Sequence, residues 1–132
     1  PAIVIDFGTA TTFDVISKQG SYEGGIIVPG LRLSAESLFA KTAMLPRLEE
    51  FKSPSSLIGK DTKGSILSGL FYGYGAMSRG LIDLLSKKIK GTPQVVVTGG
   101  YTALMKKFIY RKIHHIDKDL VFKGMSSLYF SP

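Results

Sequence analysis

Two short apolar runs that each lead into glycine limit the folds open to this chain most strongly. Residues 2–5 read Ala-Ile-Val-Ile and are followed by Asp6, and residues 94–100 read QVVVTGG. Uninterrupted apolar runs of this length are typical of strands buried on both faces of a sheet. Such sheets belong to α/β folds, which bind ligands beyond the carboxyl ends of their strands. The sequence therefore predicts an α/β domain with a ligand site where the two runs end.

The rest of the chain alternates between strand and helix patterns. Further strands are expected at residues 11–16, 22–28 and 111–116, and the first two are joined by a hairpin turn at Gly20. Helical spacing of apolar residues is found at residues 31–43, 61–89, 101–108 and 117–130. This order predicts a mixed sheet that starts with a β-hairpin and continues through crossover helices. Because a buried strand comes first, we also expect that part of the protein precedes Pro1.

Composition excludes several classes of protein. The chain has 132 residues, enough for one domain with a core, and it has no cysteine, which rules out disulfides and cysteine-ligated zinc. It contains no run of about 20 apolar residues of the kind that crosses a membrane. Its first residues lack the basic and then apolar pattern of a secretory signal. We therefore expect a cytoplasmic protein without a membrane anchor.

Positive charge is concentrated in the last third of the chain. Residues 1–85 carry eight Lys/Arg and eight Asp/Glu, whereas residues 86–132 carry nine Lys/Arg against two Asp, which accounts for the net charge of +7. A basic region of this kind occurs in proteins that bind polyanions. Solvated helix faces also explain it, and the arginines and interleaved aromatic residues typical of nucleic-acid readers are few. We therefore do not expect nucleic acid as a partner.

The segment DFGTATT places an acid, a glycine and three threonines where the first strand ends. Gly8 lets a ligand approach the backbone, while the threonines Thr9, Thr11 and Thr12 offer donors of the kind that bind phosphate. Asp6 would repel a phosphate unless a cation, Mg²⁺ or a monovalent ion, lay between the two. The segment thus predicts a phosphate together with a metal ion at Asp6. The alternative is a hairpin in which the threonines are ordinary strand residues and Asp6 caps a turn.

Glycines mark two further segments. Gly99 and Gly100 would let a flat ligand lie against bare backbone, and the helix that follows offers its N-terminus to a phosphate. Five glycines lie within the helix expected at 61–89, at positions 64, 69, 73, 75 and 80. Each one costs a helix about 1 kcal/mol relative to alanine. We therefore expect a close neighbour along this helix, either another backbone or a ligand.

Taken together, these segments resemble one known family. DFGTATTFD, GGIIVPGL, FAKTAMLPR, IGKDT, the glycine-rich helix and VVVTGG follow one another in the order of the motifs in the C-terminal half of type III pantothenate kinases. The resemblance covers roughly residues 3–124. It implies one lobe of the actin-like (ribonuclease H-like) ATPase fold, in which two similar α/β lobes enclose ATP between them.

The resemblance also implies an activity. Members of this family use ATP to phosphorylate pantothenate to 4'-phosphopantothenate, the first step of coenzyme A biosynthesis. They require Mg²⁺ with the ATP and a monovalent cation such as K⁺ or NH₄⁺, and they are homodimers.

By resemblance, several residues of this chain take on roles. Asp6 ligates the monovalent cation, and Thr9 contacts the nucleotide in a phosphate loop that also contains Gly8, Thr11 and Thr12. Gly99 and Gly100 lie beside the adenosine. Thr62, in IGKDT, contacts pantothenate.

The other half of the family's site is absent from the sequence. The first phosphate loop, a DxGNT-like strand end, and the GxDR segment with its catalytic aspartate do not occur here. That aspartate would act as the base on the pantothenate hydroxyl. We therefore interpret residues 1–132 as the C-terminal lobe of a two-lobed kinase without its N-terminal lobe. No residue of this chain is assigned a catalytic role, and we expect the chain to be inactive alone.

Three other interpretations are open at this point. The chain could come from another small-molecule kinase, or a phosphatase, of the same superfamily. It could belong to a non-catalytic kinase homologue that regulates transcription, in which case DNA binding should depend steeply on salt. It could also be a dimerisation module without nucleotide affinity.

Overall fold

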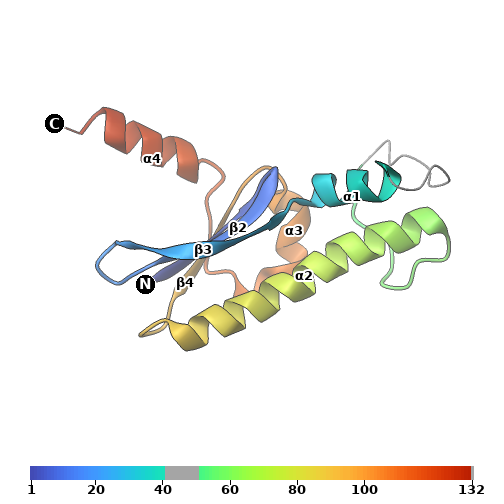
Figure 1. Ribbon diagram of the computed structural model, residues 1–132, viewed down its shortest axis with the longest axis horizontal. Coiled ribbons are helices and arrows are strands. Elements are labelled where there is room, and N and C mark those ends of the chain that lie inside the picture. The colour runs from blue at the N-terminus through green and yellow to red at the C-terminus, as the bar shows by residue number, and fades with distance from the viewer. Residues whose placement is uncertain (41–50, 132) are drawn as a thin grey trace.

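The computed structural model describes residues 1–40 and 51–131 of the chain. Within these residues a five-stranded sheet has the strand order β3-β2-β1-β4-β5 (Figure 1). The strands are β1 (Ala2–Phe7), β2 (Ala10–Ile16), β3 (Tyr22–Pro29), β4 (Gln94–Thr98) and β5 (His115–Ile116). The helices are α1 (Leu31–Ala40), α2 (Thr62–Lys88), α3 (Thr102–Ile109) and α4 (Leu120–Tyr129), with a short 3₁₀ turn, η1 (Tyr110–Lys112).

The sheet is mixed, as the element order predicts. β1 pairs antiparallel with β2, which pairs antiparallel with β3, so the first three strands form a meander. On its other side β1 pairs parallel with β4, and β4 pairs parallel with β5. The parallel pairs require crossover connections, and α2 and α3 provide them. The carboxyl ends of β1, β4 and β5 therefore meet at one edge of the sheet.

The core lies on one face of this sheet. Ile3, Ile5 and Phe7 alternate along β1 and are fully buried, because side chains at every second position of a strand share a face. They pack in one cluster with side chains from the helices, among them Phe71 of α2 and Met105 of α3. Burying each side chain of this size contributes about 1.5–3 kcal/mol. Figure 1 shows α2 and α3 on this side of the sheet, whereas α4 lies apart from them, next to the C-terminus.

Helix α2 approaches α3 closely at one of its five glycines. A methyl group on Gly75 would lie 2.7 Å from Cβ of Phe108 in α3, so the two helices meet there. Gly69, Gly73 and Gly80 have no atom of the described residues within 4 Å of such a methyl group. The close neighbour expected from the sequence is thus present at Gly75, and three of the other four positions are open, whereas Gly64 lies beside the carboxylate that caps the helix.

Two expected elements differ in extent. The strand expected at 111–116 is wrong over most of its length, because residues 110–112 form η1 and only His115 and Ile116 form β5. Its apolar residues Ile113 and Ile116 are three positions apart, a spacing that does not fit the two-residue period of a strand. The last helix begins at Leu120 instead of 117. The expected end of the first helix, residues 41–43, lies outside the described residues.

Across the described ranges, we find no helix with both the length and the apolar character needed to cross a membrane.

Candidate functional site

Asp6 and Thr98 lie side by side at the carboxyl edge of the sheet. They are partners in the parallel register of β1 and β4, and Thr12 of β2 is the partner of Asp6 on the other side. These three side chains therefore share the sheet face opposite the core. The turn after β4 is fastened to β1 by the backbone N–H of Tyr101, which donates to the carbonyl oxygen of Phe7 at 3.0 Å.

The two glycines after β4 serve different purposes. Gly99 has a φ of 97°, a left-handed conformation that glycine adopts without strain. A methyl group there would lie 2.6 Å from the backbone N and C of Phe7 and would also collide with Oδ1 of Asp6. Gly100 has open space around it. Gly99 therefore brings the turn against β1, whereas Gly100 leaves backbone accessible to a ligand.

The surroundings of Asp6 favour a cation. Burial, and after it the negative charge of Asp14, raise the pKa of the Asp6 carboxyl. Within the described part of the chain Asp6 has no ion-pair partner, while Thr12 Oγ1 donates to Asp14 Oδ2 at 2.9 Å. Carboxylate and hydroxyl oxygens are the ligands that K⁺ and Mg²⁺ prefer. The residues present therefore fit a metal ion at Asp6.

A complete protein cage for that ion is not formed by the described residues. They contain no group of three or more His, Cys, Asp or Glu side chains placed to hold a metal. An ion held by one carboxylate keeps coordination positions for water or for phosphate oxygens, which is how Mg²⁺ is usually bound beside a nucleotide.

A cavity of about 400 Å³ lies at this edge of the sheet. Asp6 and the backbone of Gly99 and Gly100 line one part of it, together with Thr98 and Ala103. The remaining lining residues are Lys118, Val121 and Phe122, from the segment that enters α4 and from its first turn. A volume of this size is in the range of small-ligand pockets. The structure thus brings three of the sequence-predicted residues, Asp6, Gly99 and Gly100, into one cavity.

The other residues of the predicted phosphate loop lie near this edge but do not line the cavity. Gly8 and Thr9 form the tight turn between β1 and β2, in which the N–H of Gly8 donates to the carbonyl oxygen of Ala10. Thr9 is exposed. Thr11 pairs with Phe7 and is 1 % exposed on the core face, so its side chain lies on the opposite side of the sheet from Asp6.

Thr62 lies apart from the cavity, at the first position of α2. Asp61 caps this helix by accepting a hydrogen bond from the N–H of Gly64 at 2.6 Å, and Thr62 is exposed. The middle of α2 is fastened to the end of β3, where the hydroxyl of Tyr74 donates to the carbonyl oxygen of Pro29 at 2.5 Å. The N-terminal half of α2 therefore extends beyond the sheet (Figure 1).

Sequence reasoning missed the contribution of Lys118, Val121 and Phe122 to the cavity. A signal was available, because β5 is a third parallel strand and its carboxyl end must lie at the same edge as those of β1 and β4. Residues directly after β5 therefore reach the same site. The assignment of residues 111–116 to one long strand hid this short connection.

Comparisons with known proteins agree with the motifs. The family model described as type III pantothenate kinase matches residues 1–84. The type III pantothenate kinase of Desulforapulum autotrophicum is 45% identical over 130 residues, which are 98% of this chain and 49% of that protein. That of Syntrophotalea carbinolica is 44% identical over 127 residues, 96% of this chain and 49% of that protein. The chain spans about half the length of these curated relatives.

A solved structure with the same fold is the ethanolamine utilization protein EutJ from Carboxydothermus hydrogenoformans. It superposes with a TM-score of 0.50 at 21% identity, covering 87% of this chain and 43% of that one. This likeness concerns the fold alone, and it confirms the expected fold class, a mixed α/β sheet of the actin-like type. With the family match over residues 1–84 and relatives above 40% identity across almost the whole chain, this chain belongs to the type III pantothenate kinase family.

Proposed function

We propose that this chain is the nucleotide-binding C-terminal lobe of an enzyme that phosphorylates pantothenate with ATP, the first step of coenzyme A biosynthesis. The observation that carries this proposal is the cavity that is lined by Asp6, by Gly99 and by the open backbone of Gly100. The names of the relatives support the substrate, and the edge of the sheet is where α/β folds bind ligands.

The chain's own residues divide the binding task. Gly99 and Gly100 receive the adenosine, and the turn that contains Gly8 and Thr9, followed by Thr12, approaches the phosphates. Asp6 holds a monovalent cation, and Mg²⁺ accompanies the ATP. When bound, these ions neutralise phosphate charge that Asp6 would otherwise repel. Thr62, at the exposed start of α2, contacts pantothenate. Thr11 contributes through its backbone and its strand position, because its hydroxyl is buried on the core face.

The catalytic base lies outside this chain. The relatives are about twice as long as the chain, which supports a second, N-terminal lobe as the source of the base. The assembled enzyme acts as a homodimer in the cytoplasm. The open glycines Gly69 and Gly73 on the exposed side of α2 provide a surface on which a second copy can pack closely.

Ligand binding by the 132-residue chain tests the nucleotide site. We expect calorimetry to detect MgATP binding that is stronger in KCl than in choline chloride at equal ionic strength. Asp6→Asn should remove the difference between the two salts, because the amide cannot hold the cation. Asp83→Asn is the matched control, since Asp83 is exposed and pairs with Lys112 away from the cavity. Absence of MgATP binding in both salts would refute the proposed function.

A coupled ATP/pantothenate assay tests the division between two lobes. The chain alone should show no turnover above background, because it lacks the base. Adding the part of the Desulforapulum autotrophicum relative that this chain does not span should restore K⁺-dependent turnover. Substantial turnover by the chain alone would contradict the assignment of the base to the other lobe.

A further inference from the structure

The cavity beside Asp6 has a second wall that the sheet does not supply. Besides Gly99 and Gly100, it is lined by Lys118 and by Val121 and Phe122 of α4. Phe122 is 68 % exposed, an unusual state for a phenylalanine, since large aromatic side chains are normally buried. The cavity thus combines an exposed aromatic ring with the accessible backbone of Gly100.

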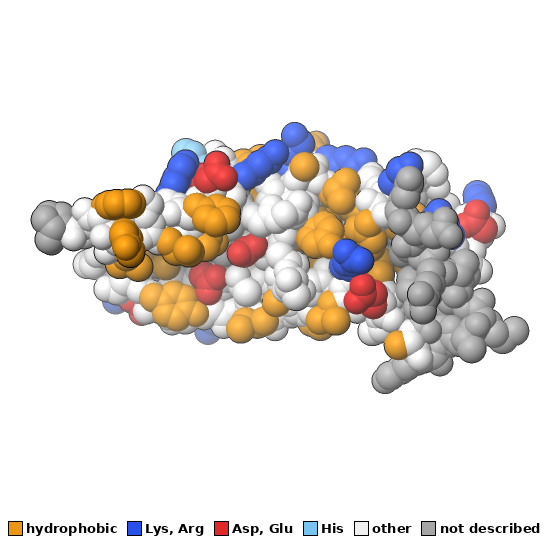
Figure 2. Space-filling view, turned by 90° about the horizontal axis from the view of Figure 1, so that it is seen from above, with side chains coloured by type: hydrophobic (Ala, Val, Ile, Leu, Met, Phe, Trp, Pro, Cys, Tyr) orange, Lys and Arg blue, Asp and Glu red, His pale blue; other side chains and the backbone are white. Residues whose placement is uncertain are grey.

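Helix α4 makes few packing contacts that would hold it in place. None of its residues is buried, and Figure 2 shows hydrophobic side chains gathered over this end of the molecule. Its position depends on the short segment that joins it to β5. There the backbone N–H of Asp117 donates to the carbonyl oxygen of Val97 in β4 at 3.0 Å, which fixes Asp117 to the sheet.

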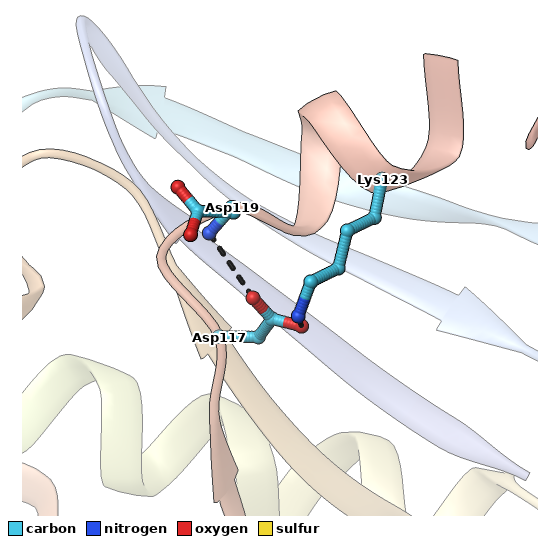
Figure 3. A network of polar contacts seen from close by, with 3 residues as sticks. All are labelled: Asp117, Asp119 and Lys123. Carbon is cyan, nitrogen blue, oxygen red and sulfur yellow. Dashed lines mark hydrogen bonds and ion pairs between the residues drawn. The ribbon is translucent and has the colours of Figure 1, made fainter. Parts of the chain in front are cut away.

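The side chain of Asp117 connects this fixed point to α4. Its Oδ1 accepts a hydrogen bond from the backbone N–H of Asp119 at 3.1 Å, directly before the helix (Figure 3). Its Oδ2 lies 2.7 Å from Nζ of Lys123, in the first turns of the helix. Lys123 is the neighbour of Phe122 in the sequence. The Asp117–Lys123 pair thus joins the part of α4 that carries Phe122 to the residue that is fixed to β4.

We propose that Phe122 is a nucleotide-binding residue that packs on the adenine base from the side opposite Gly99–Gly100, and that Asp117 positions it. The inference rests on the proposed function. It assigns the adenine ring, rather than the phosphates, to the wall of the cavity formed by α4. An aromatic ring and a peptide plane are both flat, so a flat heterocycle in the cavity can stack on either of them. Base–aromatic stacking of this kind changes affinity by roughly ten-fold when the ring is removed.

Replacing Phe122 by tryptophan allows adenine contact at this position to be measured by fluorescence, because the chain contains no tryptophan of its own. In Phe122→Trp the single indole should change its fluorescence when MgATP is added, and inorganic triphosphate should leave it unchanged. Phe130→Trp is the matched control, because Phe130 is 78 % exposed at the other end of α4 and does not line the cavity. An equal response of the two variants to MgATP, or of Phe122→Trp to both ligands, would overturn the inference.

Binding affinities for MgATP and for triphosphate distinguish contacts to the adenine from contacts to the phosphates. Phe122→Ala should weaken MgATP binding by roughly ten-fold and leave triphosphate binding unchanged, while Phe122→Tyr should retain wild-type affinity for both. If the wild-type chain binds MgATP and Phe122→Ala binds it equally well, the inference fails and the proposed function stands. If the wild-type chain binds neither ligand, both are refuted.

The positioning of Phe122 by Asp117 is tested by the ligand affinities of further variants. Asp117→Asn and Lys123→Met should each weaken MgATP binding without affecting triphosphate binding, and the double variant should lose no more than either single variant. A variant that had merely unfolded would lose both ligands and its helical circular dichroism. Unchanged MgATP affinity in both single variants would remove Asp117 from the proposal.

Discussion

Gly99 shows how much one residue can matter at the end of a strand. Its backbone is in the left-handed region, and the space that a side chain would need is occupied by Phe7 and Asp6. We expect Gly99→Ala to lower the free energy of unfolding by about 2 kcal/mol or more, since backbone strain and a steric clash add up. Urea denaturation measures this change.

Gly100→Ala is the natural control for that measurement. Gly100 is the next residue along the chain, it has open space around it, and its φ is not positive. Its substitution should change the free energy of unfolding by no more than about 0.5 kcal/mol. Equal losses in the two variants would show that the clash with Phe7 and Asp6 does not control stability at this turn.

Among the helices, α2 offers a test of close packing against open surface. Gly75→Ala places a methyl group 2.7 Å from Cβ of Phe108, so the variant should lose about 1–2 kcal/mol even though alanine favours helices. Gly80→Ala adds its methyl group to open space and should gain about 0.5–1 kcal/mol. Chemical denaturation of both variants is expected to give opposite signs, and the same sign would contradict the packing of α2 on α3.

The element α4 should respond to acid through Asp117. The hydrogen bond from Lys123 lowers the pKa of Asp117, and the same contact raises the pKa of Lys123. Because the folded chain favours the ionised carboxylate, its contribution to stability is present above the usual pKa near 3.8 and is lost as pH falls through the lowered value. The contribution of Lys123 is lost only as pH rises above about 10.5.

Thermal unfolding of the wild type and of Asp117→Asn checks this pH dependence. The wild type should melt at the higher temperature at neutral pH, and the two midpoints should converge in strong acid, once the wild-type carboxyl is protonated. A difference that persists below the lowered pKa would mean that the asparagine acts through some feature other than the lost charge.

For the molecule as a whole, association is the property that the open side of α2 should control. We expect Gly73→Leu to shift the proposed homodimer toward monomer in analytical ultracentrifugation, because a bulky side chain prevents close approach of a second helix. Lys88→Leu, also exposed but at the far end of α2, should leave the association unchanged. A dimer as stable in Gly73→Leu as in the wild type would place the interface elsewhere.

The sequence predicted the central strands of the sheet better than it predicted β5 and the helix that follows it. Apolar runs identified β1 and β4, and their parallel pairing then placed Asp6 beside Thr98. Burial on the core face explains why Thr11 does not share that site, and strand alternation contains this information. The wall formed by Phe122 was missed, because residues 111–116 were expected as one long strand, whereas β5 has only two residues and the Asp117–Lys123 pair that follows it has no local sequence signature.

The strand order also means that β1 is synthesised long before one of its two partner strands. β1 lies between β2, which follows it at once, and β4, which begins at Gln94 almost 90 residues after β1 ends. At about 5–20 residues per second, a ribosome needs roughly 5–20 seconds to make that stretch. During this time the nascent meander exposes the hydrogen-bonding edge of β1 and its apolar side chains, which is the kind of edge that aggregates. We therefore expect the newly made meander to be prone to aggregation until β4 has been synthesised.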